Sequence, residues 1–314
     1  MRLQVAVAAG CLLAATATPA RAADEFGGPR SIPARLAAKS LLLDGASVGA
    51  LTVAVGERGH VLLSRDGGAS WTQADVPTRA MLTGVHLHDE KLGWAVGHDE
   101  TILRTRDGGA TWDLVRSDPE AERPLLDVWF RDAEHGIAVG AYGAFLVTAD
   151  GGTTWEERPI GEGDFHLNRI APAAGDTLYL AAEAGHIYRS DDAGESWIAL
   201  RTPYEGSYFG VLPLGDGGLL AFGLRGNLFR SDDRGATWSE LATGTEATLM
   251  AGVEIDGQVL VAGLAGVLLR SADGGRSFQS EAFDDRRAHA GILRTANRLL
   301  LLGDGGARNL EETR

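Results

Sequence analysis

The apolar residues of this chain fall in short runs that polar turns and glycines separate. The clearest unit runs Leu126–Phe130, then Gly136–Gly140, then Ala144–Thr148, and ends with Thr154–Arg158 after a turn. No stretch keeps an apolar period of 3.6 residues, so helix is expected to be scarce. Four short strands in a unit of about 42 residues are typical of one antiparallel blade of a β-propeller.

One turn sequence marks the unit and recurs six times. This octamer reads Ser/Thr-x-Asp-x-Gly-x-Ser/Thr-Trp, and its aspartates are spaced by 41, 43, 42, 41 and 40 residues. The aspartates are Asp66, Asp107, Asp150, Asp192, Asp233 and Asp273. The closing aromatic residues are Trp71, Trp112, Trp155, Trp197, Trp238 and Phe278. So regular a repeat predicts at least six blades.

Each residue type of the octamer has a structural role that elementary chemistry explains. The aspartate can accept hydrogen bonds from backbone N–H groups of its own turn. The invariant glycine suits a backbone position with positive φ, where a Cβ would clash. The aromatic residue can bury a large apolar surface between neighbouring blades. The octamer is therefore expected to be architecture, not a catalytic device.

The chain continues past the sixth octamer with the beginning of another blade. Ala290–Arg294 and Arg298–Gly303 match the first two strands of a unit, and Gly305–Asn309 matches the start of a third. We expect an all-β, seven-bladed propeller of four-stranded antiparallel blades over residues 40–309. Residues 23–39, and 30–38 in particular, would complete the last blade by pairing the two ends, which removes open strand edges. Six blades with loosely packed ends are the alternative, and residues 310–314 are expected to be a tail.

The N-terminal residues predict export. Residues 1–22 have Arg2, an apolar run and an Ala20-Arg21-Ala22 cleavage signal, which is the pattern of a secretory signal peptide. Cleavage would remove Cys11, the one cysteine, and change the net charge from −14 to −16 by removing two arginines. A chain this acidic is a poor binder of nucleic acid. We expect a periplasmic or secreted protein, itself monomeric, without a membrane span.

The octamer resembles the Asp-box, or bacterial neuraminidase repeat, over residues 40 to about 306. Strands such as Trp94-Ala-Val-Gly97 and Ile137-Ala-Val-Gly140, followed by a glycine loop and the octamer, resemble the photosystem II assembly and stability factor propellers and their relatives in non-photosynthetic bacteria. The resemblance implies a non-enzymatic scaffold or accessory factor that binds a protein of a membrane or envelope complex. No cofactor is expected.

The alternative function is a glycoside hydrolase, since sialidases carry the same repeat. That resemblance would require an Arg-Ile-Pro motif, which Arg30-Ser31-Ile32-Pro33 breaks, and a Tyr/Glu nucleophilic pair that cannot be assigned. Another glycosidase would need an unrecognised pair of carboxylates. His86 and His88 lie on one face of a strand, but a surface strand end explains them better than zinc, and no metal site is expected.

Recognition is expected at one end of the central channel, where loops vary on a constant scaffold. The polar and aromatic residues of the innermost strands, together with one loop arginine, are the candidates for binding. They are Asp127, Trp129, Asn168, Arg169, Tyr208 and Arg225.

Overall fold

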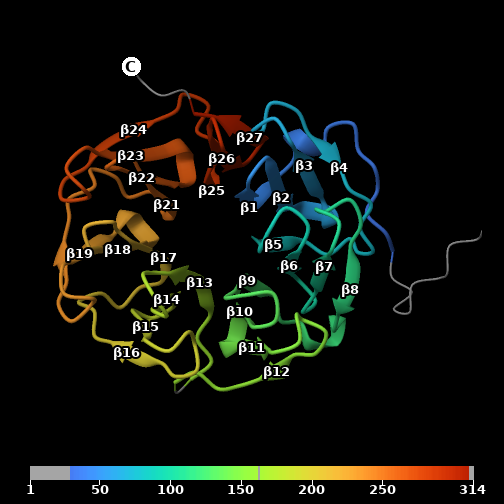
Figure 1. Cartoon of the computed structure of the whole chain (residues 1–314). Coiled ribbons are helices and arrows are strands. Elements are labelled where there is room, and N and C mark those ends of the chain that lie inside the picture. Colours follow the sequence, from blue (N-terminus) through green and yellow to red (C-terminus); the bar gives the residue numbers. More distant parts are fainter. Residues whose placement is uncertain (1–28, 162, 311–314) are drawn as a thin grey trace, which may run out of the picture.

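The computed structural model describes residues 29–161 and 163–310, which form seven sheets around a central axis (Figure 1). Each sheet is a blade whose strands follow one another outwards from the axis. Blades 1 to 3 contain β1 (Leu42–Val48), β2 (Leu51–Gly56), β3 (Val61–Ser64), β4 (Thr72–Gln73), β5 (Leu82–Leu87), β6 (Gly93–Gly97), β7 (Ile102–Thr105), β8 (Asp113–Arg116), β9 (Leu125–Phe130), β10 (Gly136–Gly140), β11 (Phe145–Thr148) and β12 (Glu156–Glu157).

Blades 4 to 7 follow the same order along the chain. They contain β13 (Leu167–Pro172), β14 (Leu178–Ala182), β15 (Ile187–Ser190), β16 (Ile198–Leu200), β17 (Tyr208–Pro213), β18 (Leu219–Gly223), β19 (Leu228–Ser231), β20 (Ser239–Glu240), β21 (Leu249–Ile255), β22 (Gln258–Gly263), β23 (Val267–Ser271), β24 (Gln279–Ala282), β25 (His289–Arg294), β26 (Leu299–Gly303) and β27 (Gly306–Asn309). The seven-bladed prediction is confirmed, and the strands within each blade pair antiparallel.

Helical structure in the described residues is limited to short 3-10 turns. They are η1 (Ala37–Lys39), η2 (Glu57–Gly59), η3 (Pro119–Ala121), η4 (Ala141–Gly143), η5 (Leu224–Gly226) and η6 (Leu264–Gly266). No helix in this part of the chain is long and apolar enough to cross a bilayer.

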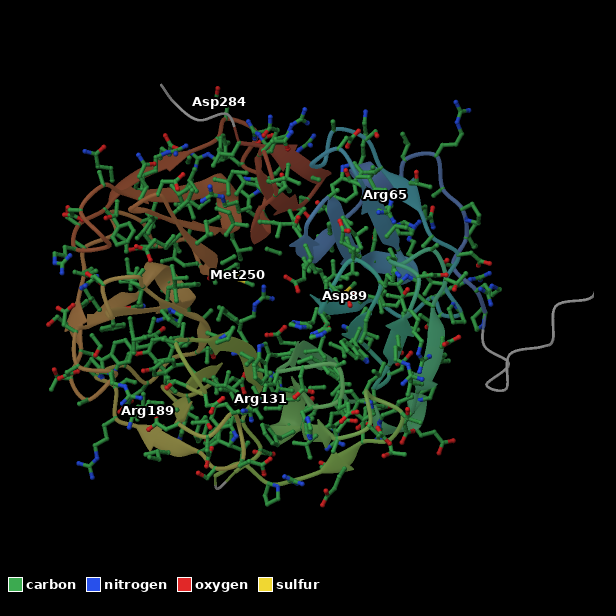
Figure 2. The ribbon with its side chains drawn as sticks, viewed as in Figure 1. Arg65, Asp89, Arg131, Arg189, Met250 and Asp284 are labelled. Carbon is green, nitrogen blue, oxygen red and sulfur yellow. The ribbon has the colours of Figure 1, made fainter. Side chains whose placement is uncertain are left out.

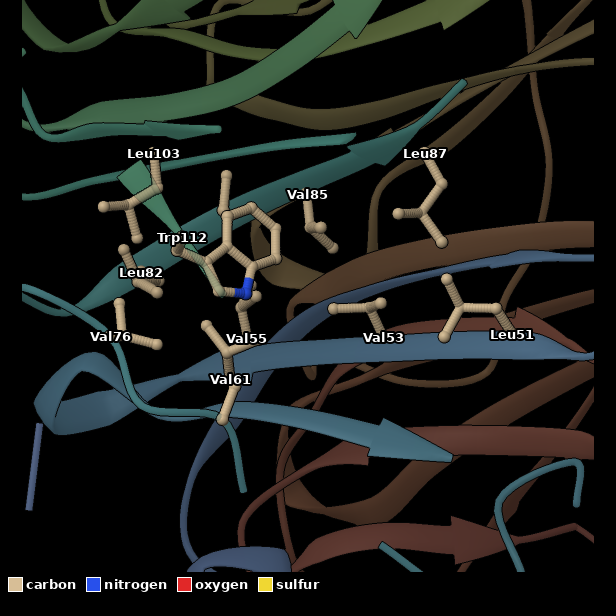
Figure 3. Close-up of a cluster of buried hydrophobic side chains, with 12 residues drawn as sticks. Leu51, Val53, Val55, Val61, Val76, Leu82, Val85, Leu87, Leu103 and Trp112 are labelled. Atoms are coloured by element: carbon tan, nitrogen blue, oxygen red, sulfur yellow. The ribbon is translucent and has the colours of Figure 1, made fainter. Parts of the chain in front are cut away.

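The hydrophobic core lies between successive blades. In the cluster of Figure 3, Leu51, Val53 and Val55 of β2 pack against Leu82 of β5 and Trp112 of the second octamer. Each octamer aromatic residue lies in such a cluster with residues of the preceding blade; they are Trp71, Trp112, Trp155, Trp197, Trp238 and Phe278. The repeat therefore stabilises the ring by joining each blade to the one before it.

The octamer itself is a closed hydrogen-bonded turn between the third and fourth strands of a blade. Asp150 accepts hydrogen bonds from the hydroxyl of Thr148 (2.9 Å), from the backbone N–H and hydroxyl of Thr154 (2.9 and 2.7 Å) and from the N–H of Thr153 (2.9 Å). These bonds lower the pKa of Asp150 to about 2. The octamer glycine has φ between 77° and 95° in all six copies, a conformation that disfavours any residue with a Cβ.

The ring closes differently from the expected pairing of its ends. Blade 7 has three strands in the described residues, and residues 30–38 do not form its fourth strand. Instead, Ser31 donates its N–H to the carbonyl of Val76, and its hydroxyl oxygen accepts the N–H of Val76, which ties the segment to the outer side of blade 1. Pro33 has no N–H for a ladder, and η1 follows it. Packing of Trp71 beside Leu302, and of β1 beside β25, joins the two ends.

Candidate functional site at the channel mouth

One end of the ring gathers the parts of the blades that differ most from each other. The innermost strand of each blade begins there, because its first residue pairs with the last residue of the second strand, as Leu125 does with Gly140. The loop from the second to the third strand starts from the same end. The octamers start from the other end, since Thr148 pairs with Gly136. We call the first end the channel mouth and define it by these strand starts and loops.

Every innermost strand has the same irregularity just inside the mouth. The register with the second strand shifts after the first residue in all seven blades, as between Leu42 and Asp44 in blade 1. Such a bulge places two successive residues opposite one and bends the strand. The first of these residues is half-buried in each blade: Leu43, Thr83, Leu126, Asn168, Phe209, Met250 and Ala290. Met250 is seen beside the central axis in Figure 2.

The second bulge position brings three charged groups together across the axis. Arg169 of blade 4 donates from Nη2 to Oδ1 of Asp44 in blade 1 over 2.7 Å, and its Nε lies 3.8 Å from Oδ2 of Asp127 in blade 3. The two carboxylates are buried, whereas the Arg169 side chain is 36% exposed. Arg169 thus links three blades, two of them far apart in the ring.

Both aspartates also join neighbouring blades through the backbone. Asp44 accepts the N–H of Val85 in blade 2 over 3.0 Å, and Asp127 accepts the N–H of Ile170 in blade 4 over 2.8 Å. Burial raises the pKa of Asp127 to about 6, while Arg169 opposes this shift and the charge of Asp44 adds to it. The charge of Asp44 raises the pKa of Arg169 above its ordinary value. We call Asp44, Asp127 and Arg169 the plug, because they lie across the channel. Most of their hydrogen-bonding groups are paired with each other or with the backbone of neighbouring blades.

Three other predicted site residues are used inside the fold. Asn168 donates to the carbonyl of Tyr208 over 2.8 Å and so joins blades 4 and 5. Tyr208 is fully buried beside Tyr204 and Phe229, and burial raises its pKa to about 12. Trp129 packs against blade 4, away from the strand start. Tyr208 stands at a strand start, but its side chain is buried between blades 4 and 5, and the Trp129 side chain packs on blade 4 at the far end of its strand, so neither side chain is presented at the mouth.

Arg225, the sixth candidate, is exposed and belongs to a ring of loop residues at the mouth. In six blades the loop between the second and third strands has one non-glycine residue with φ between 53° and 59°; these residues are Arg58, Asp99, Tyr142, Ala184, Arg225 and Ala265. Left-handed backbone costs such residues free energy, of order 1 kcal/mol each. The loop gives these residues the same backbone conformation, while their side chains differ in type. The side chain of Arg58 is 78% exposed, and Tyr142 is 57% exposed.

Sequence reasoning missed Asp44 although a signal was present. Residues 42–44 read Leu-Leu-Asp, the same tripeptide as residues 125–127. Aligning the starts of the innermost strands would have placed Asp44 and Asp127 at one position of the repeat.

A second missed group lies at the mouth between blades 2 and 3. Glu100 stands where five other loops have glycine and has φ of 45°. Its buried carboxylate accepts from Nε of Arg116 over 2.9 Å and from Nε of Arg123 over 2.7 Å, and Arg123 also binds Glu157. Two guanidinium groups compensate both the burial and the backbone strain of Glu100.

The described residues contain no group of three or more His, Cys, Asp or Glu side chains arranged for a metal ion. His86 lies beside the stacked rings of Trp94 and Phe130, and burial lowers its pKa to about 4. Its neutral imidazole therefore acts as part of the interface between blades 2 and 3.

Comparison with known protein families identifies the family of this propeller. A family model described as photosynthesis system II assembly factor YCF48 matches residues 63–124 and 116–251, more than half of the chain. The chain belongs to this family. A comparison with curated proteins gives no match.

Solved structures with the same fold include members of this family and an enzyme. The structure titled "YCF48 bound to D1 peptide" has a TM-score of 0.73 at 20% identity, covering 88% of this chain and 95% of that one. YCF48 from Cyanidioschyzon merolae has a TM-score of 0.71 at 18% identity, covering 88% and 95%. Virginiamycin B lyase from Staphylococcus aureus has 0.73 at 12% identity, covering 85% and 93%. At these identities the likeness establishes the fold, which hosts more than one activity.

Proposed function

We propose that this chain is an exported, non-enzymatic scaffold that binds a segment of a partner protein at the channel mouth. It would act as an assembly or accessory factor for a membrane or envelope complex. Membership of the YCF48 family supports this function. The structure of a similar propeller is titled as bound to D1 peptide, so peptide binding is compatible with the fold.

The observation that carries the proposal is the ring of six loop residues with left-handed backbone. A scaffold that accepts strain to present different side chains in one geometry is typical of a recognition surface. Tyr142 supplies a large exposed aromatic ring, held edge-on to His166 with centroids 5.0 Å apart. Arg58 and Arg225 supply exposed guanidinium groups for carboxylates or carbonyl oxygens of a partner.

The plug closes the channel beneath this ring of loop residues. Because Arg169 binds Asp44 across the axis, the mouth is closed by charged groups that are already paired. The half-buried Leu43, Leu126, Phe209 and Met250 add apolar surface around it. A partner segment would therefore lie across the mouth and contact loop side chains and this apolar surface, without entering the channel.

The glycoside hydrolase alternative has no observation in its favour. Asp127, with its raised pKa, is the carboxylate that most resembles a general acid. Yet Asp127 and Asp44 are buried, accept backbone N–H groups of neighbouring blades and face Arg169. Their hydrogen bonds join neighbouring blades, which is a structural role.

The test is site-specific photo-crosslinking in the producing cells. The photoreactive residue p-benzoyl-phenylalanine replaces Tyr142 in the mouth or, as a control, Ile198 on the outer strand β16. The two positions match in exposure, at 57% and 54%. We expect crosslinks from position 142 to one membrane or envelope protein identified by mass spectrometry, weakened by Arg58→Glu with Arg225→Glu, and no such adduct from position 198.

Two results would contradict the proposal. Equal adducts from both positions, or none from position 142, would remove the mouth as the binding surface. Turnover of a glycoside panel that Asp127→Asn abolishes in a folded protein would favour the hydrolase instead. Cell fractionation of the same strain tests export, because residues 1–22 lie outside the described part of the chain.

A further inference from the structure

A recurring contact attaches three of the six octamers to the blade before them. An arginine of the third strand donates to the carbonyl of the residue that follows the octamer aspartate. Three examples share this geometry: Arg104 to Gly151 (2.9 Å), Arg189 to Arg234 (3.0 Å) and Arg230 to Gly274 (2.6 Å). We call the surface that receives an octamer the octamer seat.

The second part of the seat is a large side chain directly across the sheet from the arginine. The cross-strand pairs are Trp94 with Arg104, Tyr179 with Arg189 and Leu220 with Arg230. Octamer glycines pack onto this side: a Cβ added to Gly152 would lie 2.8 Å from Nε1 of Trp94, and one added to Gly275 would lie 3.1 Å from Leu220. The seat therefore combines an apolar platform with a guanidinium donor.

Blade 6 carries the same pair but receives no octamer from the described residues. Leu260 of β22 pairs with Arg270 of β23 in the register of the other seats. Above them lies a cavity of about 740 Å³ between blades 6 and 7, which Leu299 and Leu310 also line. Arg270 instead donates to Oε1 of Glu281 over 2.6 Å and remains 29% exposed. The vacant seat keeps the chemistry that holds an octamer in three other junctions.

Blade 7 also offers an unpaired strand edge beside this cavity. Gly303 and Gly306 pair across the two-residue turn, so hydrogen-bonded pairs alternate from there along β26 and β27. The N–H of Leu310 donates to Leu299, in agreement with this alternation. The N–H groups of Ala307 and Asn309 therefore point away from β26. In the six other blades a fourth strand covers this edge.

We infer that the vacant seat and the edge of β27 together bind an extended segment of another protein. The segment would add to blade 7 as its fourth strand, place a tryptophan or phenylalanine in the cavity and offer a backbone carbonyl to Arg270. Strand addition of this kind gives affinity through main-chain bonds and specificity through a side-chain pocket. The aromatic requirement follows from the residues at the six other junctions, five tryptophans and one phenylalanine.

A folded second copy of this chain is a poor occupant. All six of its octamers place their aromatic residues against their own preceding blades. An occupant must therefore present an octamer-like or strand-like segment that its own fold leaves free. This site lies on the side of the ring opposite the channel mouth and is independent of the function proposed above.

The test uses a peptide of this chain as the probe. A fluorescent peptide with the sequence of residues 105–116, which contains an octamer and the strand β8, is titrated against the mature chain and followed by anisotropy. We expect saturable binding, and at least about tenfold weaker binding when the peptide carries Trp112→Ala. A scrambled peptide of the same composition should not bind.

Protein variants locate the bound peptide. Arg270→Ala should weaken binding several-fold, and Asn309→Pro should abolish it by removing an outward N–H, at a position where an edge strand tolerates proline. Arg225→Ala, in the mouth, is the matched control and should bind the peptide like the unaltered chain. This control separates the two proposals, since failure at the mouth leaves peptide binding at the seat intact.

Three outcomes would overturn the inference. Binding that neither Arg270→Ala nor Asn309→Pro changes would place the peptide elsewhere. Absence of binding, both to the mature chain and to a chain lacking residues 23–28, would show that the seat takes no strand. Binding that appears only after removal of residues 23–28 would make this chain's own N-terminal segment the occupant, in place of a partner.

Discussion

The blades are joined by a repeated contact on the octamer side of the ring and by contacts that differ from blade to blade at the channel mouth. On the octamer side, one aspartate, one glycine and one aromatic residue repeat almost unchanged around the ring. At the channel mouth, the residue type at the equivalent position varies between blades among aspartate, arginine, alanine and glycine: Asp44, Gly84, Asp127, Arg169, Gly210, Ala251 and Gly291. Each octamer contacts only the preceding blade, so the same residues can serve at every junction. The pairing of Arg169 with Asp44 and Asp127 at the mouth occurs once in the ring. Repetition therefore marks architecture here, and departure from it marks the region where specificity can reside.

The largest effect is expected from removing a buried octamer aromatic residue. Trp112 is 4% exposed and fills the interface of blades 1 and 2. Trp112→Ala should lower the free energy of unfolding by about 3–5 kcal/mol, measured by chemical denaturation. Trp155, which is only partly buried, is the matched control and should cost less when changed to alanine. Equal losses would mean that burial between blades does not determine the contribution of the octamer.

The second-largest loss of unfolding free energy is expected when the pairing of Arg169 with Asp44 and Asp127 is removed. Arg169→Ala leaves the buried carboxylates of Asp44 and Asp127 without their shared cation. We expect a loss of about 2–3 kcal/mol, somewhat below that of a fully buried pair because Arg169 is partly exposed. Arg225→Ala, which removes an exposed arginine with no ion pair in the described residues, should leave the unfolding free energy nearly unchanged. A similar loss in both variants would contradict a structural role of the plug.

The raised pKa of Asp127 gives the mouth a pH dependence of its own. Folded Asp127 holds its proton up to about pH 6, whereas the unfolded chain releases it near 3.8. The folded state thus binds more protons between these values, so this group makes stability fall as the pH rises from about 4 to about 6. Asp44 and Arg169 are the charged groups that face it. Asp127→Asn should remove of the order of 1 kcal/mol of this difference in denaturation at the two pH values; an unchanged slope would contradict the shift.

The sequence predicted the ring well because the octamer repeats. Blade number, strand order and antiparallel pairing follow from six spaced copies and two further strand patterns. The seventh blade shows the limit of this reasoning. The repeat spacing shows that blade 7 ends after its third strand, but nothing in residues 30–38 indicates where they bond. Ser31 pairs with Val76 of blade 1 through contacts that periodicity does not encode.

The candidate site was harder to predict because its residues do not repeat. The aromatic chemistry of Tyr208 and Trp129 makes them candidates for binding, yet side-chain direction along a bulged strand buries Tyr208 and turns Trp129 toward blade 4. Arg169 and Asp127 do meet, but their partner Asp44 is 125 residues from Arg169. Only the closed ring brings these residues to one point, and a single sequence contains no measure of that distance.

The smallest effect is expected at one octamer aspartate, and its pH dependence has the opposite sign to that of Asp127. Asp150→Ala removes bonds to Thr148, Thr153 and Thr154 at an exposed turn, which should cost about 1 kcal/mol at pH 7. The pKa of Asp150 is lowered to about 2, so its stabilisation is present above about pH 4 and is lost as the pH falls toward 2. Denaturation from pH 7 to 2 should therefore bring Asp150→Ala and the unaltered chain together only below pH 4, whereas Asp127→Asn differs from the unaltered chain in its slope between pH 4 and 6. If both variants changed the same pH range, the octamers and the mouth would not be separate electrostatic regions.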